Sequence, residues 1–362
     1  MKIASVVGAR PNFIKLAPLS KEIRKHFDEI IIHTGQHYDY EMDRVFFEQL
    51  RIPEPDYHLG VGSGTHGYQT GEMVKRIEKV LMDEKPDLVI VYGDTNTTLA
   101  GALASVKLHI PLAHVEAGLR CYDKRIPEEI NRVLTDHCSD LLFCPTERAV
   151  ENLKKEGITE GVYLTGDVMV DAVKQNITIA ERVSTVLNDL NVKPKDYYLV
   201  TVHRAENTDN MNRLRNIVDA LCEVNGNVIF PCHPRTEKAL KKFGLWDKLK
   251  RNVNVIKPVG YLDMLVLEKN AKKIITDSGG VQKEAYIFKV PCITLRDRTE
   301  WVETVEDGWN VLVGVDKNKI LKAIKSFNPN EKRYSSRFGD GNACKKIVKI
   351  LIRWFDVEDS HP

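Results

Sequence analysis

In Lys273-Ile-Ile-Thr-Asp277-Ser278-Gly279-Gly280-Val281-Gln282-Lys283-Glu284-Ala285, a β-branched run stops at two glycines and a helical pattern begins. The pattern predicts a buried strand that turns directly into a helix. Ser278, Gly279 and Gly280 would present unpaired backbone N–H groups at the positive end of the helix dipole, which favours an anion such as a phosphate. Any strand-Gly-Gly-helix junction gives part of this pattern, so a purely structural turn is the alternative.

The residue one turn further on indicates what the anion belongs to. Glu284 lies four residues after Gly280 and therefore shares its helix face. A carboxylate behind a phosphate site can accept hydrogen bonds from two vicinal hydroxyls, which indicates that a ribose binds there. Phosphate and ribose together predict a nucleotide.

Strand-to-helix alternation runs through the whole chain and predicts parallel, doubly wound α/β sheets. The predicted strands form two series, at 2–7, 29–33, 87–92, 111–115, 141–144 and 161–164, and at 197–202, 227–231, 252–256, 273–276, 290–295 and 310–313. A chain of 362 residues is expected to form about two domains. We place them at residues 1–170 and 171–340, with the polar stretch Asn191–Asp196 as a boundary. An amphipathic helix within residues 341–362 is expected to cross back to the first domain.

Composition excludes several classes of protein. Apolar residues make up 43% and charged residues 29%, and the formal net charge of +2 indicates neither a nucleic-acid arm nor a membrane-surface patch. No apolar run approaches the roughly 20 residues of a membrane span. Met1-Lys-Ile-Ala begins a strand rather than a signal peptide, so a cytoplasmic location is expected. The seven cysteines form no close pair and are interpreted as core residues.

Charged side chains follow the strands of the first series. In open parallel sheets, ligands bind beyond the carboxyl ends of the strands. Arg10 and Lys15 supply two cations beside a helix start, although Lys15 alone fits a solvated helix face. Three carboxylates would lie around one crevice, those of Asp94, Glu116 and Glu128. Their mutual repulsion is unfavourable, so such a cluster is expected only where a reaction requires it. Taken singly, Asp94 fits a helix N-cap and Glu128 an ordinary acidic first turn.

Histidines and arginines dominate the strand ends of the second series. His203 and Arg204 follow one strand, and His233 follows the next. His203 fits a role at a phosphate or in proton transfer, with a core histidine as the alternative. His114, Glu116, His203 and His233 do not show familiar zinc spacing, so no metal is expected.

Together these motifs resemble those of the non-hydrolysing UDP-N-acetylglucosamine 2-epimerases. The motifs run in order as Gly-Ala-Arg-Pro-Asn-Phe-Ile-Lys at 8–15, Gly-Asp-Thr-Asn-Thr-Thr at 93–98, His-Val-Glu-Ala-Gly-Leu-Arg at 114–120, Pro-Glu-Glu-Ile-Asn-Arg at 127–132, Val-Thr-Val-His-Arg-Ala-Glu-Asn at 200–207, and Asp-Ser-Gly-Gly-Val-Gln-Lys-Glu-Ala at 277–285. The resemblance covers nearly the whole chain. It implies two Rossmann-like domains with a ligand cleft between them, as in B-type glycosyltransferases.

The resemblance also implies a reaction and a set of residues. Family members interconvert UDP-N-acetylglucosamine and UDP-N-acetylmannosamine by eliminating UDP to a 2-acetamidoglucal and adding it back, without a metal or other cofactor. Such a chain would supply precursors for surface polysaccharide and act as a homodimer. By motif position, Asp94, Glu116 and Glu128 match the family's catalytic carboxylates, and His203 matches the histidine at the diphosphate. The matching nucleotide contacts are Arg10, Lys15, Ser278, Gly279, Gly280 and Glu284.

Two departures leave alternatives open. Many bacterial epimerases carry an Arg-Pro pair where this chain has Trp301-Val302, and Thr299-Glu300-Trp301 is similar to relatives acting on diacetamido uronic acid UDP-sugars. Gly35-Gln36-His37 resembles the start of a regulatory UDP-sugar site, but the residues after it match poorly. A UDP-sugar glycosyltransferase, a hydrolysing epimerase and a non-catalytic UDP-sugar sensor are the competing functions.

Overall fold

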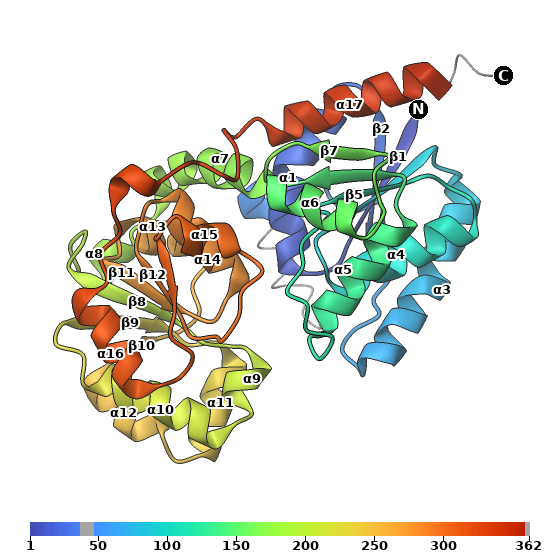
Figure 1. Ribbon diagram of the computed structural model, residues 1–362. Helices are drawn as coiled ribbons and strands as arrows, with labels where there is room; N and C mark the ends of the chain where they lie inside the picture. The colour runs from blue at the N-terminus through green and yellow to red at the C-terminus, as the bar shows by residue number, and fades with distance from the viewer. Residues whose placement is uncertain (37–46, 359–362) are drawn as a thin grey trace. The chain divides into compact units, whose positions relative to one another are not determined.

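The chain folds into two compact α/β units. The computed structural model describes residues 1–36 and 47–358 (Figure 1). The first unit holds Met1–Gln175 together with the C-terminal segment from Arg337, and the second holds Asn176–Ser336. The chain passes from the first unit into the second within helix α7 (Val168–Val183). His37 and the residues after it in the possible regulatory motif lie outside the described residues.

The first unit is built on a seven-stranded parallel sheet of order β3-β2-β1-β4-β5-β6-β7. Its strands are β1 (Lys2–Val7), β2 (Asp28–His33), β3 (Tyr57–His58), β4 (Leu88–Tyr92), β5 (Leu112–Val115), β6 (Leu141–Cys144) and β7 (Val162–Leu164). Besides α7, its helices are α1 (Arg10–Ile23), α3 (His66–Glu84), α4 (Asn96–Lys107), α5 (Pro127–Cys138), α6 (Glu147–Lys155) and α17 (Ala343–Glu358).

The second unit repeats the plan with a six-stranded parallel sheet of order β10-β9-β8-β11-β12-β13. The strands are β8 (Tyr197–Thr201), β9 (Asn227–Pro231), β10 (Asn254–Ile256), β11 (Lys273–Thr276), β12 (Cys292–Thr294) and β13 (Asn310–Leu312). The helices are α8 (Val186–Asp189), α9 (Ala205–Thr208), α10 (Met211–Cys222), α11 (Pro234–Lys242), α12 (Trp246–Asn252), α13 (Tyr261–Asn270), α14 (Gly279–Ile287), α15 (Val302–Glu306) and α16 (Lys317–Ser326), followed by a 3₁₀ turn (Glu331–Arg333).

The predicted parallel, doubly wound sheets are confirmed, with strand ends that shift by one or two residues. The two-residue strand β3 escaped the sequence analysis because it is too short to show any periodicity. The polar stretch Asn191–Asp196 is not a boundary: it lies inside the second unit, where Lys195 Nζ donates to the carbonyls of Lys269 and Ala271. Its polarity reflects an exposed loop rather than a linker.

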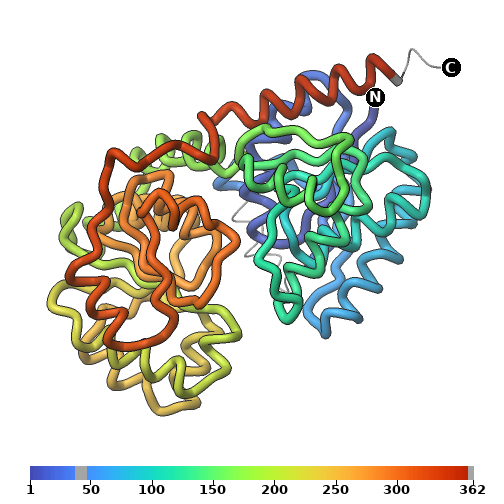
Figure 2. The backbone as a smooth tube through the Cα atoms, in the orientation of Figure 1, coloured from blue at the N-terminus to red at the C-terminus, as the bar shows by residue number. Residues whose placement is uncertain are grey.

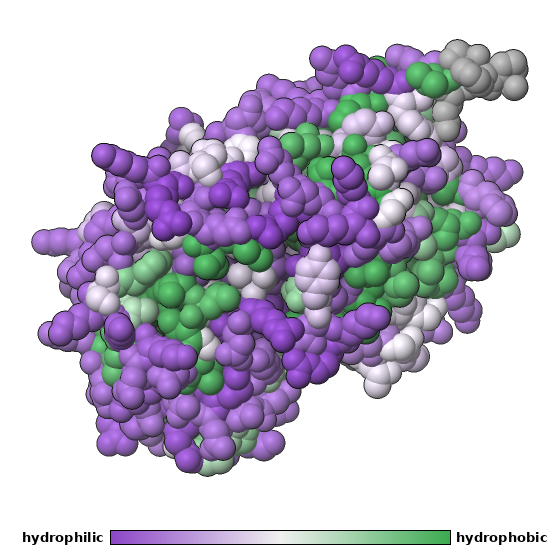
Figure 3. Space-filling view, viewed as in Figure 1, coloured by the Kyte–Doolittle hydropathy of each residue, from purple (hydrophilic) through white to green (hydrophobic). Residues whose placement is uncertain are grey.

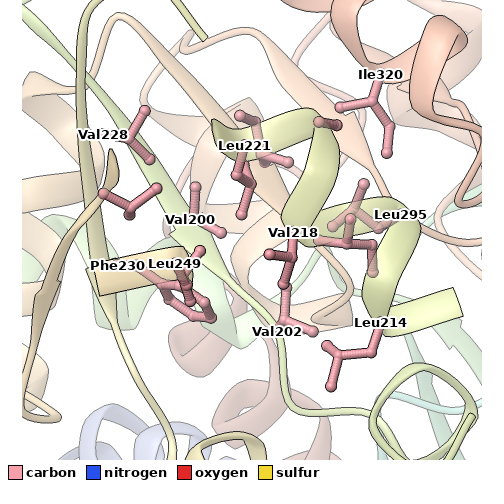
Figure 4. Close-up of a cluster of buried hydrophobic side chains, with 14 of the residues drawn as sticks. Val200, Val202, Leu214, Val218, Leu221, Val228, Phe230, Leu249, Leu295 and Ile320 are labelled. Atoms are coloured by element: carbon pink, nitrogen blue, oxygen red, sulfur yellow. The ribbon is translucent and has the colours of Figure 1, made fainter. Parts of the chain in front are cut away.

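Continuous runs of buried β-branched residues explain the parallel sheets, since both faces of each sheet are covered by helices. Figure 4 shows one core cluster of the second unit, in which Val200 of β8 and Phe230 of β9 face Leu214, Val218 and Leu221 of α10. In Figure 3, hydrophilic residues cover most of the face shown. No helix in the described part of the chain is long and apolar enough to cross a membrane.

The C-terminal helix belongs to the first unit. Figure 2 shows this red segment beside the blue N-terminal part of the chain, and α17 packs against α1. Phe355 of α17 meets Phe27 at 5.4 Å between ring centroids. The buried Asp171 carboxylate accepts hydrogen bonds from the backbone N–H groups of Ala343 and Cys344, both at 3.1 Å, and so caps the start of α17.

Candidate active site

Each unit gathers its charged side chains at one point of its sheet. In the first sheet, β2 and β3 lie on one side of β1, and β4 to β7 lie on the other side. In the second sheet, β9 and β10 lie on one side of β8, and β11 to β13 lie on the other side. The strand order therefore reverses between β1 and β4 and between β8 and β11. Ligands of open α/β sheets bind at such switch points, beyond the carboxyl ends of the strands. Arg10 follows β1 and Asp94 follows β4, whereas His203 follows β8 and Ser278 follows β11. Each unit therefore has its own group of candidate residues, called the first half-site in the first unit and the second half-site in the second unit.

In the first half-site, Asn12 fixes the turn from β1 into α1. Its side-chain oxygen accepts hydrogen bonds from the N–H groups of Gly8 (3.3 Å) and Ala9 (3.0 Å), and its amide donates to the Tyr92 carbonyl at 2.8 Å. Asn12 thereby ties the end of β1 to the end of β4. Arg10, the first residue of α1, lies partly exposed at this turn.

Lys15 is buried rather than part of a solvated helix face, which corrects the simpler interpretation of its sequence pattern. Its side chain is 7% exposed, and Nζ lies 3.3 Å from Glu116 Oε1. A Cβ atom at Gly93 would lie 3.3 Å from Lys15 Nζ, and Gly93 has a positive φ of 68°. Glycine therefore suits position 93, where the ion pair comes close to the backbone.

Glu116 occupies a strained position at the end of β5. Its φ is +77°, a left-handed conformation that residues other than glycine rarely adopt. The N–H groups of Glu116 and Ala117 both donate to the Phe143 carbonyl, each at 3.1 Å. Strain of this kind costs about 1–3 kcal/mol and is found preferentially where a side chain must point at a ligand.

Asp94 is not the N-cap that its sequence position allows. The cap of α4 is Thr95, whose hydroxyl accepts from the Thr98 N–H, and Thr98 completes a capping box. The Asp94 carboxylate is left for another partner, and its Oδ2 lies 2.8 Å from Arg132 Nη2.

The charges around Asp94 oppose one another. Desolvation raises the pKa of the Asp94 carboxyl, Arg132 and Lys15 lower it, and repulsion from Glu128 and Glu116 raises it again, so that the net direction is upward. A carboxyl with a raised pKa exchanges protons more readily near neutral pH than an ordinary aspartate does. This is the electrostatic signature of an acid-base group.

Glu128 and Glu129 stand side by side in the first turn of α5 but have different surroundings. Glu129 is buried, and its carboxylate accepts the backbone N–H groups of Cys121 (3.0 Å) and Tyr122 (2.7 Å). Within the described residues, no hydrogen bond or ion pair engages the half-buried Glu128 side chain, although its charge acts on Asp94. Glu128 is therefore available for a ligand.

A largely buried network of hydrogen bonds and ion pairs lies next to these carboxylates. His114 Nε2 donates to the Gly93 carbonyl at 2.7 Å, and Nδ1 lies 2.6 Å from Asp136 Oδ1. Arg120 Nη1 reaches Asp136 Oδ2 at 2.6 Å and joins Glu156 through two further bonds. Burial opposes ionisation of Asp136, but His114 and Arg120 outweigh it and lower its pKa. His114 thus serves the scaffold rather than a metal.

In the second half-site, the fully buried Asp277 organises the strand ends. Its carboxylate accepts the backbone N–H groups of His203 and Arg204 at 3.1 Å and the side-chain amide of Asn207 at 3.0 Å. One side chain from the end of β11 therefore fixes the turn after β8. The sequence analysis assigned no role to Asp277.

His203 is not a core histidine, because its side chain is 41% exposed. Its Nδ1 lies 3.5 Å from Asp277 Oδ1, and its ring centroid lies 5.9 Å from that of His233. Loss of hydration lowers the pKa of His203, Asp277 raises it, and the cations Arg204 and Arg235 lower it, with a net downward direction. An arriving diphosphate would favour the protonated imidazole.

Helix α14 begins as predicted, with Ser278 as the N-cap whose hydroxyl accepts the Val281 N–H at 3.5 Å. The N–H groups of Gly279 and Gly280 fall in the first turn, where an α-helix offers them no internal acceptor. A Cβ at Gly279 would lie 2.5 Å from Glu300 Oε1, whereas a Cβ at Gly280 would find only Ser278 Oγ, at 3.9 Å. Gly279 is thus required by the neighbouring loop.

Glu284 is buried one turn behind Gly280, as the spacing predicts. It is 5% exposed, and burial together with the nearby Glu284 carboxylate raises the pKa of Tyr261 on α13 well above its usual range. Lys283, on the face of Gly279, lies 4.0 Å from the ring centroid of Trp301 in a cation–π contact. The unusual residue Trp301 therefore adjoins the start of α14.

The sequence analysis missed Arg132, whose only signal was its spacing of four residues from Glu128 on α5. Its Nε donates to the Glu128 carbonyl at 3.1 Å, and its Nη2 pairs with Asp94. Among the described residues, no group of three or more His, Cys, Asp or Glu side chains is arranged to hold a metal ion.

Comparison with known proteins supplies the context for these half-sites. The sequence model of the family described as UDP-N-acetylglucosamine 2-epimerase matches residues 21–352. The chain belongs to this family. It is 61% identical over 354 residues to a UDP-N-acetylglucosamine 2-epimerase homolog of Methanococcus maripaludis, covering 97% of this chain and 99% of that protein.

Two further relatives of this epimerase bear on its fold and substrate. The crystal structure of the Methanocaldococcus jannaschii UDP-GlcNAc 2-epimerase, in complex with UDP-GlcNAc and UDP, matches with a TM-score of 0.92 and 53% identity, covering 98% of this chain and all of that one. The UDP-2,3-diacetamido-2,3-dideoxy-D-glucuronate 2-epimerase of Pseudomonas aeruginosa is 48% identical over 363 residues, covering 98% of this chain and all of that protein. The predicted family and B-type glycosyltransferase-like fold are confirmed, and the chain is an isomerase of the epimerase class.

Proposed function

We propose that this epimerase interconverts UDP-N-acetylglucosamine and UDP-N-acetylmannosamine without net hydrolysis. The observation that carries the proposal is the carboxylate cluster of the first half-site, where Asp94, Glu116 and Glu128 adjoin Lys15 and Arg132. Binding a nucleotide sugar does not call for three carboxylates near one another. Inverting carbon 2 does, because a proton must leave one face of the sugar ring and arrive at the other.

The proposed reaction is an elimination followed by an addition. A carboxylate of the first unit takes the proton from carbon 2 while the bond from carbon 1 to the UDP oxygen breaks, which leaves a carbon 1–carbon 2 double bond and UDP. UDP then adds back to carbon 1 while a second acid group protonates carbon 2 from the opposite face. Cations stabilise the charge that the diphosphate gains as it leaves. Arg10, Lys15 and His203 are proposed for that role.

The second unit is proposed to bind the UDP part of the substrate. The first turn of α14, at Ser278, Gly279 and Gly280, would receive a phosphate, and the Glu284 carboxylate would accept the ribose hydroxyls. Replacing Glu284 by alanine should therefore weaken UDP binding in calorimetry. An unchanged affinity would remove the ribose assignment.

Incubation with UDP-N-acetylglucosamine in deuterated water, followed by proton NMR, tests the function. Deuterium at carbon 2 together with intact UDP-N-acetylmannosamine is the expected result. Free N-acetylmannosamine with UDP would indicate a hydrolysing epimerase, and transfer that requires an added acceptor would indicate a glycosyltransferase. Binding without exchange would indicate a sensor.

A second candidate substrate is a UDP-diacetamido uronic acid sugar. It is favoured by the name of the Pseudomonas aeruginosa relative and by Trp301, which packs under Lys283 beside the start of α14. Parallel assays with both sugars separate the candidates, because kcat/KM for the true substrate should be higher by at least about tenfold.

The biological setting is proposed from the family. The epimerase would work in the cytoplasm and supply N-acetylmannosamine-type precursors for surface polysaccharide. It would do so as a homodimer, which light scattering of the purified protein tests directly.

A further inference from the structure

A buried carboxyl group with no assigned role lies behind the proposed ribose site. Glu268, in the last turns of α13, is fully buried. Neither of its side-chain oxygens receives a hydrogen bond from a donor within residues 1–36 and 47–358. An ionised carboxylate in such surroundings would be very unfavourable, because burial removes its hydration and nothing replaces it.

Within residues 1–36 and 47–358, the titratable neighbours of Glu268 include no cation. Its carboxyl adjoins the Glu284 carboxyl on α14, a helix that packs against α13. Its further titratable neighbours are Tyr261 of α13, Tyr197 of β8 and Cys292 of β12. The Tyr197 hydroxyl already donates to the Leu267 carbonyl at 2.6 Å, so it is not available to Glu268.

Two neighbouring carboxyl groups can form a hydrogen bond with each other only if one of them carries a proton. Burial and the charge of Glu284 both raise the pKa of Glu268 well above its usual range. Glu284 is 5% exposed whereas Glu268 is fully buried, so a negative charge is less unfavourable on Glu284 than on Glu268. The proton therefore belongs on Glu268.

We propose that Glu268 is a neutral carboxylic acid that positions Glu284 by donating a hydrogen bond to it. The bond would hold the Glu284 carboxylate in the orientation in which it can accept the two ribose hydroxyls. Glu268 is a positioning residue, since it does not itself touch the substrate. The inference rests on the proposed binding of UDP by Glu284.

The ligand test compares UDP with 2′-deoxyuridine diphosphate by calorimetry, because the ratio of their affinities reports on the ribose contact alone. Glu268→Gln keeps a neutral donor of similar size, and Glu268→Leu removes the donor. We expect E268Q to keep the wild-type preference for UDP. We expect E268L to narrow that preference by about ten- to a hundredfold, the value of one hydrogen bond to a charged acceptor.

Each other outcome overturns a specific statement. If E268L keeps the wild-type ratio, Glu268 does not position Glu284. If E268Q and E268L narrow the ratio equally, the site needs a charged Glu268 rather than a neutral one. If the wild-type protein binds UDP without preferring it over the deoxy form, the ribose assignment of Glu284 fails and the inference fails with it. Failure of the proposed function is distinct, because the wild-type protein would then show no UDP binding or no exchange at carbon 2.

A ligand-free measurement checks the protonation separately. In the unfolded chain a glutamate releases its proton above about pH 4.3, whereas a carboxyl with a raised pKa in the folded protein keeps it. The contribution of that carboxyl to stability is therefore present below about pH 4.3 and is lost as the pH rises through the pKa of the folded state. Glutamine does not titrate. Raising the pH from 5 to 7 should therefore shift the folding equilibrium in favour of E268Q relative to wild type, by up to about tenfold per pH unit. Urea unfolding at the two pH values measures this shift.

The matched control is Glu29→Gln, at another buried carboxyl group. Glu29 accepts hydrogen bonds from the hydroxyls of Ser5 and Ser20 and from Arg24 Nε at 2.9 Å, so its amide variant should lose stability at both pH values. Parallel curves for wild type and E268Q across this pH range would show that Glu268 is ionised in the folded protein and would overturn the proposal.

Discussion

At the scale of single residues, adjacent side chains of similar chemistry have different tasks in this epimerase. Thr95 caps α4, which leaves Asp94 to pair with Arg132. Glu129 binds the backbone, whereas Glu128 acts on Asp94 by its charge. A substitution of the adjacent residue is therefore a suitable control for a substitution in the site.

Glu128→Gln should lower turnover by about 10²- to 10⁴-fold, because an amide keeps the shape of the side chain but cannot exchange a proton. UDP affinity in calorimetry should stay at the wild-type value. The matched control is Glu129→Gln, which weakens the hydrogen bonds from Cys121 and Tyr122 and the ion pair with Arg132 Nε at 3.6 Å but leaves the Arg132–Asp94 pair in place. E129Q should lose about 1–3 kcal/mol of unfolding free energy while its folded fraction stays active. Equal losses of turnover in both variants would contradict the assignment.

The pH dependence of the reaction should respond to Arg132, because its charge lowers the pKa of Asp94. In Arg132→Met the pKa of Asp94 rises further. The limb of the pH–rate profile that belongs to Asp94 should then move to higher pH by about 1–3 units. This is the acidic limb if Asp94 is the base, and the basic limb if it is the acid.

The control for this profile is Arg125→Met, since Arg125 is 84% exposed and pairs with Asp123. It should leave both limbs in place. A profile of R132M that superimposes on the wild-type profile would mean that Asp94 does not titrate during catalysis.

At the scale of elements, the start of α14 contains two adjacent glycines whose surroundings differ. Gly279 must lack a Cβ because Glu300 and Trp301 pack against it in the free protein. Gly280 has open space instead, so a side chain there would meet only a ligand. Substitutions at the two positions should therefore have different effects on stability and on UDP binding.

Gly279→Ala should cost about 1–3 kcal/mol of unfolding free energy, because Glu300 has to move. Gly280→Ala should be neutral or gain up to about 1 kcal/mol, since alanine favours the helix. Despite that, G280A should bind UDP about tenfold more weakly or worse, because its methyl group would occupy the approach to the N–H groups. If G280A keeps full UDP affinity, no phosphate lies at this turn.

At the scale of the whole molecule, each unit has its own hydrophobic core, and the first is completed by a segment from the far end of the chain. Leu351 of α17 is fully buried in the first unit, and Ile320 of α16 is fully buried in the second. Figure 4 shows Ile320 in the core cluster of the second unit. Stability is therefore expected to be divided between two cooperative units.

Leu351→Ala should destabilise the first unit by about 2–5 kcal/mol and leave the second unit unchanged. Hydrogen exchange measured by mass spectrometry should show faster exchange in peptides of β1 and β4 but not in those of β8 and β11. Ile320→Ala is the matched control and should give the opposite pattern. Faster exchange throughout the chain in either variant would mean that the units unfold together.

Three features could be predicted from the amino-acid sequence: the parallel sheets, the start of α14 and the family. These features depend on short-range signals, because strand runs, glycines and helix caps act over a few residues. Gly280 and Glu284 could be placed on one face for the same reason. Even the grouping of Asp94, Glu116 and Glu128 follows from their positions after neighbouring strands of a parallel sheet.

Which side chains meet, and how their pKa values shift, depends on the packing of segments that are distant in the sequence. Lys15 pairs with Glu116 across 101 residues of sequence, Asp277 holds the turn at His203, and Glu268 lies against Glu284 from another helix. No local pattern records such contacts, because they form where helices and strand ends pack. Burial at those contacts then shifts the pKa of the groups involved: it raises the pKa of both Asp94 and Glu268.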